Sequence, residues 1–79
     1  MAAAVKKLSY RERRELEELP ARIESLETEQ RALAGTIADA SFYKQTAAAI
    51  TAALERTAAI ERDLLDLYAR WDALVSRPT

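Results

Sequence analysis

Five basic side chains gather in the first fourteen residues of the sequence, and side chains of this type can hold an anion. They are Lys6, Lys7, Arg11, Arg13 and Arg14, and Glu12 is their one acidic neighbour. Five positive charges against one negative charge give this end +4, whereas the whole 79-residue chain has a formal net charge of −1, which leaves −5 for the remainder. This asymmetry indicates either a surface for an anionic partner or a helix end whose charges are simply solvated.

The residues needed for most other chemistry are missing. The chain has no cysteine and no histidine, so disulfides, thiolate nucleophiles and the usual metal ligands are absent. Gly35 is the single glycine, which excludes a glycine-rich loop that binds nucleotide phosphates. Catalysis would have to rest on carboxylates, lysine or tyrosine, and no constellation arranges them. We therefore expect a chain without enzyme activity, metal or cofactor.

The sequence also lacks the apolar segments of an exported or membrane protein. The opening MAAAVKK is apolar over too few residues for a signal peptide, and nowhere do about twenty apolar residues run together. These features predict a soluble protein that stays in the cytoplasm and makes no membrane contact.

A first long helix, over about residues 9–38, would carry the basic cluster. Ser9 followed by Glu12 fits a capping box, in which each residue satisfies a backbone amide of the other. Beyond it, apolar residues recur in alternating steps of three and four and form one heptad seam with a single polar member. The seam consists of Leu16, Leu19, Ile23, Leu26, Gln30, Leu33 and Ile37.

A second seam predicts a helix over about residues 46–76, after a connection over about residues 39–45. It consists of Ile50, Ala53, Thr57, Ile60, Leu64, Leu67, Trp71 and Leu74. Two long helices with a short connection pack as antiparallel neighbours. The fold class is therefore all-α, a two-helix antiparallel coiled-coil hairpin over residues 9–76, preceded by a flexible basic segment over residues 1–8.

The register of this hairpin follows from facing residues whose numbers keep a constant sum. Folding at the connection pairs Leu33 with Ile50 and Leu19 with Leu64. The same register brings three pairs of oppositely charged side chains together, namely Glu15 with Arg70, Arg22 with Asp63 and Glu29 with Arg56. Such charges select the alignment of a coiled coil more than they stabilise it.

Pro20 interrupts the first helical pattern, because proline lacks an amide donor and clashes with the preceding turn. We expect a kink or a local bulge, with pairing retained on both sides. The kink would either aim the arginines at a partner or merely bend the helix around bulky side chains. Among the aromatic residues, Phe42 and Tyr43 are expected to plug the seam at the connection, and Tyr68 is expected to lie beside Arg13.

Three segments carry a family resemblance. LSYRERRELEELPARIESLE, FYKQ after the connection and YARWDAL near the end resemble the C-terminal domain of Uup-type proteins in the ABC-F class of ATPases. The resemblance spans about residues 8–74 and is weakest at the connection, where Asp39-Ala40 stands in place of Asp-Pro. It implies a hairpin that follows two ATP-binding cassettes of the same parent chain and is associated with DNA, in a class that acts on ribosomes.

Together these observations predict a DNA-binding accessory domain that contacts phosphates largely without sequence specificity. The expected contact residues are Lys6, Lys7, Arg11, Arg13 and Arg14, with Arg22 as an outlying candidate. A ribosome or structured-RNA binding arm is the first alternative. A purely structural or protein-interaction hairpin with a solvated basic end is the second.

Overall fold

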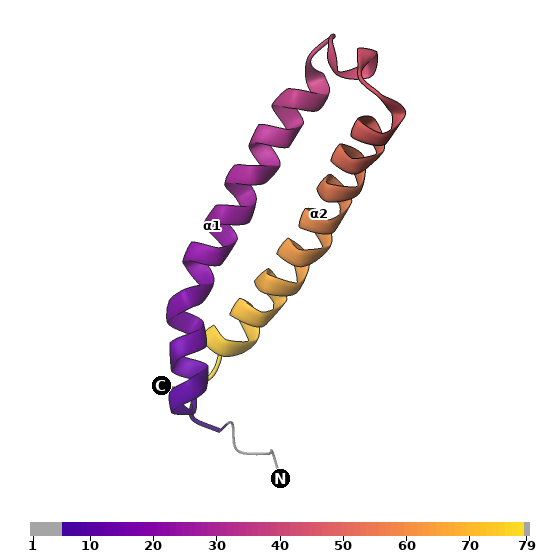
Figure 1. Ribbon diagram of the computed structural model, residues 1–79. Coiled ribbons are helices and arrows are strands. Elements are labelled where there is room, and N and C mark those ends of the chain that lie inside the picture. The colour runs from indigo at the N-terminus through magenta and orange to yellow at the C-terminus, as the bar shows by residue number, and fades with distance from the viewer. Residues whose placement is uncertain (1–5, 79) are drawn as a thin grey trace.

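The chain forms two long helices joined by a short connection (Figure 1). The computed structural model describes residues 6–78. Helix α1 spans Tyr10–Ala38 and helix α2 spans Ala47–Val75, each 29 residues long, and a 3₁₀ turn at Phe42–Lys44 lies between them. The molecule measures 60 × 24 × 16 Å. The expected two-helix antiparallel hairpin is confirmed, and its rod shape follows from two helices that can only pack side by side.

Both helices begin at side chains that cap free backbone amides. The Ser9 hydroxyl accepts from the Glu12 amide at 3.1 Å and the Glu12 carboxylate accepts from the Ser9 amide at 3.0 Å, which completes the expected capping box. Thr46 caps α2 by accepting from the Ala49 amide at 3.1 Å. Because Ser9 and Thr46 have extended backbones, each helix begins one residue after the start that the sequence suggested.

The hydrophobic core follows the two seams and lies mainly toward the end of the hairpin where the chain begins and finishes, which we call the base. Its buried members are Leu8, Leu19, Ile23, Ile60, Leu64, Leu67 and Leu74. Leu19, Ile60 and Leu74 have no exposed surface. At the opposite end Phe42 is buried, as expected, whereas Tyr43 remains 66% exposed, so only one of the two expected plug residues fills the seam.

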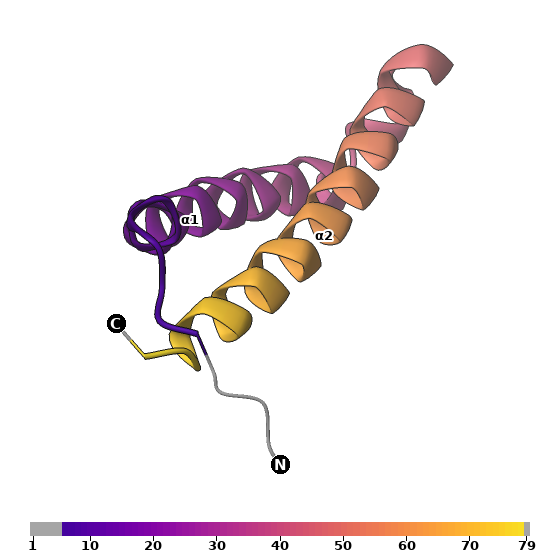
Figure 2. The same ribbon diagram turned by 90° about the horizontal axis from the view of Figure 1, so that it is seen from below.

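Two of the three expected interhelical ion pairs form. The guanidinium Nε of Arg70 lies 2.6 Å from a Glu15 oxygen, and that of Arg56 lies 2.6 Å from a Glu29 oxygen. Within residues 6–78, Arg22 forms no ion pair with Asp63, and the two side chains instead line the same open groove. Figure 2 shows that the axes of the two helices are inclined to one another.

Tyr68 contradicts the sequence-based expectation. Its hydroxyl donates to the Glu27 carboxylate on α1 and therefore does not place the ring beside Arg13. This hydrogen bond raises the pKa of Tyr68, because the nearby carboxylate disfavours a phenolate. A constant-sum register does not predict this contact between Tyr68 and Glu27.

Helix α1 continues without interruption through Pro20, which is exposed. Within the described residues neither a break nor a π-helical bulge marks the position. A kink caused by Pro20 stays a prediction.

The described part of the segment before α1, residues 6–8, contacts the segment after α2 and the core. Leu8 is 6% exposed and joins the core, and its amide donates to the Pro78 carbonyl at 3.0 Å. Burial of the leucine side chain and pairing with Pro78 place residues 6–8 against the base, and the flexibility expected for residues 1–8 stays a prediction. Residues 1–5 lie outside the described residues. Neither described helix has the length and apolar character required to span a bilayer.

Candidate nucleic-acid interface

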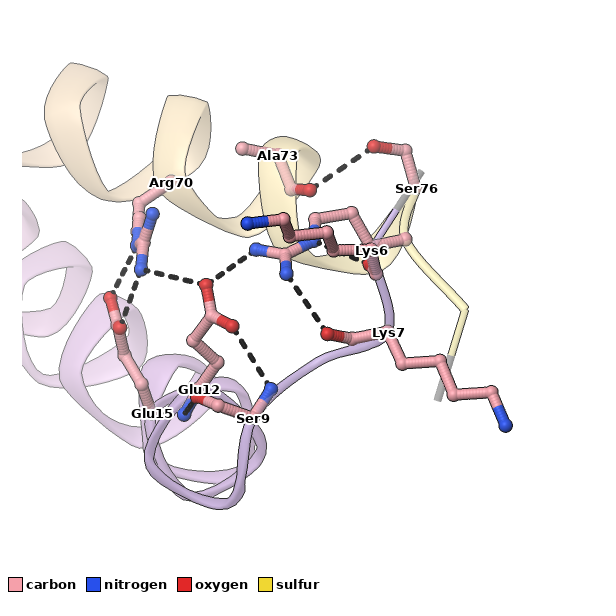
Figure 3. A network of polar contacts seen from close by, with 9 residues as sticks. Lys6, Lys7, Ser9, Glu12, Glu15, Arg70, Ala73 and Ser76 are labelled. Carbon is pink, nitrogen blue, oxygen red and sulfur yellow. Dashed lines mark hydrogen bonds and ion pairs between the residues drawn. The ribbon is translucent and has the colours of Figure 1, made fainter. Parts of the chain in front are cut away.

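At the base, a polar network joins the segment before α1 to the segment after α2 (Figure 3). Arg77, just beyond α2, donates to the carbonyls of Lys6 and Lys7 at 3.1 Å each and pairs with the Glu12 carboxylate. Arg70 approaches the same Glu12 oxygen at 3.9 Å and binds Glu15 through two hydrogen bonds of 2.6 and 2.9 Å. Glu12 thus has two roles, as the capping residue of α1 and as the anion between two arginines.

The electrostatics of Glu12 reflect these contacts. The hydrogen bond from Arg77 and then the amide of Ser9 lower the pKa of Glu12 from 4.5 to about 2, because both stabilise the carboxylate form. A folded-state pKa below the ordinary value means that ionised Glu12 stabilises the fold above about pH 4.5. That contribution is lost as the pH falls through 4.5 toward about 2.

Replacement of Glu12 by glutamine should therefore remove an acid-sensitive part of the stability. We expect Glu12→Gln to be less stable than the natural sequence at neutral pH, with the gap narrowing between about pH 4.5 and about pH 2. Urea unfolding followed by far-UV circular dichroism measures this gap across the pH series. Glu61→Gln, at an exposed position with no ion pair in the described chain, is the matched control. A gap that stays constant down to pH 2 would contradict the role of Glu12.

The arginines of α2 that face α1 have structural partners. Arg56 makes two hydrogen bonds to Glu29 at 2.6 and 2.7 Å, and Arg70 binds Glu15 with the same bidentate geometry. The pKa of Glu15 is lowered by the hydrogen bond from Arg70, and that of Glu29 by the one from Arg56. These cations are therefore neutralised locally and contribute little to attracting an anion.

Four of the basic residues singled out in the sequence have no such carboxylate partner among the described residues. Arg11 and Arg13, in the first turn of α1, are exposed and make no ion pair with any other residue in the range 6–78. Lys6 and Lys7 use only their carbonyls in the network, and Figure 3 shows the Lys7 side chain extending away from it. All four ammonium and guanidinium groups lie at the base and are available to a partner.

Arg14 and Arg22 fit the predicted cluster less well. Arg14 lies beside Arg11 and Arg13 but donates to the Tyr10 hydroxyl at 3.3 Å and approaches Glu18 at 3.6 Å, both on the helix surface. These exposed contacts are weak and raise the pKa of Arg14, so its charge is kept. Arg22 lies about two turns beyond Arg14, in the groove with Asp63, and the structure does not bring it to the other five.

The position of the arginines is itself unfavourable for an isolated helix. The N-terminal end of a helix carries partial positive charge and favours acidic side chains. Helix α1 has only Glu12 as an acidic residue in its first turn, next to Arg11 and Arg13. Cations at this end therefore cost stability rather than adding it.

Two residues of the base were not among the predicted site residues. Arg77 orders the segment that carries Lys6 and Lys7 through hydrogen bonds to their carbonyls. The sequence offered a signal for this contact, because the antiparallel register extended past the helix ends puts residue 77 opposite residues 6–8. Tyr10 is 68% exposed at the start of α1, beside the arginines. No periodic pattern points to Tyr10, because it precedes the seam.

The surface of the hairpin has no enclosed cavity in the part described. Its hollows are open grooves along the rod and at the base, lined by side chains such as Arg22 and Asp63 or Tyr10 and Arg14. Among residues 6–78 no group of three acidic side chains is placed to hold a metal ion. Open grooves beside unpaired cations suit contact with an extended polyanion better than enclosure of a small substrate.

The fold and site define a small helical-hairpin domain with a cationic base. The family model described as "ABC transporter C-terminal domain" matches residues 7–76, and the chain belongs to that family. The expected resemblance to the C-terminal domain of Uup-type proteins is confirmed.

Curated relatives and a solved structure agree with this assignment. The chain is 43% identical over 68 residues to ATP-binding protein Uup of Escherichia coli K12 and, at the same identity and length, to an ATP-binding protein Uup-like of Haemophilus influenzae. Both matches cover 86% of this chain but only 11% and 15% of those relatives. The solved C-terminal domain of a Uup protein, described as a DNA-binding coiled coil motif, has 40% identity and a TM-score of 0.82 over 87% of this chain and 81% of that one.

Proposed function

We propose that this chain is a DNA-binding accessory domain of an ABC-type ATPase and that it contacts the phosphate backbone through the base of the hairpin. The observation that carries the proposal is the contrast between the two helices. The α2 arginines that face α1 have carboxylate partners, whereas Arg11 and Arg13 of α1 have none among the described residues. Side chains that are charged, exposed and unpaired bind phosphates at little desolvation cost.

The proposed contacts are Lys6, Lys7, Arg11, Arg13 and Arg14, with Arg22 as a peripheral contact. These long side chains reach phosphates without reading base edges, so binding would depend little on sequence. The likeness to a solved Uup domain described as DNA-binding supports DNA as the partner. Because the chain spans only 10 to 15% of its curated relatives, the ATP-binding modules would belong to the parent chain, acting in the cytoplasm.

A salt series tests this proposal. With about four phosphates contacted, the logarithm of the association constant should fall with the logarithm of salt concentration with a slope near −3.6. This corresponds to a loss of roughly a hundredfold between about 50 and about 200 mM salt. Fluorescence anisotropy of a labelled duplex measures it, and a second duplex of shuffled sequence should bind equally well.

The same assay separates the proposal from its alternatives. Unlabelled duplex DNA should compete better than transfer RNA or ribosomal particles at equal phosphate concentration. Preferential competition by the RNA would replace DNA with a structured-RNA partner. An absence of binding to any of these at low salt would contradict the proposal and leave a protein-interaction hairpin.

A further inference from the structure

Tyr10 is the most exposed aromatic side chain that the structure describes. It is the first residue of α1, and 68% of its surface is accessible. A tyrosine in a small hairpin gains stability by burial, yet this ring belongs neither to the core nor to the partly buried side chains packed against it. Its hydroxyl accepts from Arg14 Nη1 at 3.3 Å, so the guanidinium lies beside the edge of the ring.

Two adjacent open hollows meet at Tyr10 and Arg14. One is also lined by Arg11 together with Glu15 and Glu18. The other is also lined by Arg13 together with Glu17. An exposed aromatic ring therefore lies between two hollows, with an arginine on either side. This arrangement suits a nucleobase stacked on the ring and phosphates bound by the arginines.

The charge balance favours the Arg11 hollow for the phosphate. Both of its carboxylates have partners, because Glu15 binds Arg70 and Glu18 approaches Arg14. Arg11 itself has no ion pair within the described chain. In the Arg13 hollow Glu17 has no such partner and repels phosphate.

We propose that Tyr10, Arg11 and Arg14 form a stacking platform for an unpaired nucleotide of DNA. The tyrosine ring supplies the face on which the nucleobase stacks, and Arg11 supplies the phosphate contact. In a continuous duplex each nucleobase is already stacked on both faces, so the platform can act only on single-stranded DNA or on unpaired nucleobases of a duplex. This inference rests on the proposed DNA binding and adds the class of DNA that is preferred.

The other exposed tyrosines lack this combination. Tyr43 is 66% exposed at the connection, but its ring meets Phe42 edge to face at 4.9 Å between centroids, and Lys44 is its neighbouring cation. Tyr68 is 42% exposed and its hydroxyl binds Glu27, whose charge disfavours a nearby phosphate. Tyr43 is therefore a matched control, with nearly equal exposure and no arginine platform.

The test compares variants on two substrates of equal phosphate number, a short oligothymidylate and a blunt-ended duplex. Loss of one stacking contact with a nucleobase typically lowers the affinity by roughly 5- to 150-fold. We expect Tyr10→Ala to weaken binding of the single strand by about tenfold and of the duplex by less than about twofold. Tyr10→Phe keeps the ring and should bind the single strand nearly as well as the natural sequence, and Tyr43→Ala should leave both affinities unchanged.

Anisotropy measures the affinities, and far-UV circular dichroism confirms that each variant is folded. Equal weakening on both substrates, unchanged single-strand affinity in Tyr10→Ala, or a similar loss in Tyr43→Ala would overturn the platform. Failure of the natural sequence to bind either DNA would instead contradict the proposed function itself. The two failures are thus distinguishable.

Discussion

Charge reversal at Arg11, Arg13 and Arg14 together is expected to weaken binding of duplex DNA by at least about a hundredfold at moderate salt. The three substitutions to glutamate remove three cations that bind phosphate and place three carboxylates where the phosphates would lie. The dependence of affinity on salt should become correspondingly shallower, by about 0.9 in slope for each phosphate that is no longer neutralised. Anisotropy of a labelled duplex across a salt series measures both quantities.

This variant should remain folded, which makes the binding result interpretable. All three arginines are exposed, and the one ion pair that the substitutions remove, between Arg14 and Glu18, is a surface pair at 3.6 Å. Acidic side chains near the start of α1 interact favourably with the helix dipole, so the substitutions should not reduce helix content. Far-UV circular dichroism and a melting curve check this point.

A matched control separates the local cluster from the overall charge. Arg31, Lys44 and Arg62 are exposed cations outside the base, and reversing all three changes the net charge by the same amount. We expect the control variant to lose far less affinity, because its sites lie along the rod or near the connection. If both variants lose affinity equally, DNA binding responds to net charge and the base is not the interface.

Leu19→Ala should have the largest effect on stability. Leu19 has no exposed surface and packs with Ile60 and Leu64 across the interface between the helices. Truncation of such a leucine removes buried apolar contacts and leaves a cavity, which costs about 2–5 kcal/mol. Since small domains are stable by only about 5–15 kcal/mol, this substitution removes a large share of the total. Urea unfolding followed by circular dichroism gives the free energy of unfolding.

Leu65→Ala provides the comparison at a solvent-facing site. Leu65 follows a core residue directly on α2 but is 69% exposed. Its truncation should change the free energy of unfolding by no more than about 0.5 kcal/mol. Equal losses in the two leucine variants would show that the heptad seam is not what holds the hairpin closed.

Much of the fold could be predicted because its determinants are local or periodic. The capping box needs only Ser9 and Glu12, three residues apart, and the heptad spacing puts apolar side chains on one face whatever the partner helix does. A constant-sum register then sufficed for Glu15 with Arg70 and Glu29 with Arg56. It failed for Arg22 with Asp63, which form no ion pair among the described residues, and for Tyr68, whose hydroxyl binds Glu27, since a register of positions does not specify which way long side chains extend.

The candidate site was less predictable than the fold. Charge clustering identified the basic residues near the start of α1, but a sequence does not say which cations already have partners. The structure leaves Arg11 and Arg13 unpaired within the described chain, engages Arg14 weakly and separates Arg22 from the others. It also adds Tyr10, which is exposed and lies outside the core.

The sequence by itself determined the helices, their seam, the hairpin connection and the basic character of one end, because short-range spacing and composition encode these properties. Only the tertiary structure decided that residues 6–8 lie against the base, through burial of Leu8 and the contacts of Arg77 with the carbonyls of Lys6 and Lys7. Such contacts join residues about seventy positions apart and lie beyond the ends of both seams, so the register places the two segments opposite one another without specifying the hydrogen bonds. These contacts form where the hairpin brings the segment before α1 to the segment after α2, and Tyr10 and its neighbouring arginines are exposed at the surface of this end.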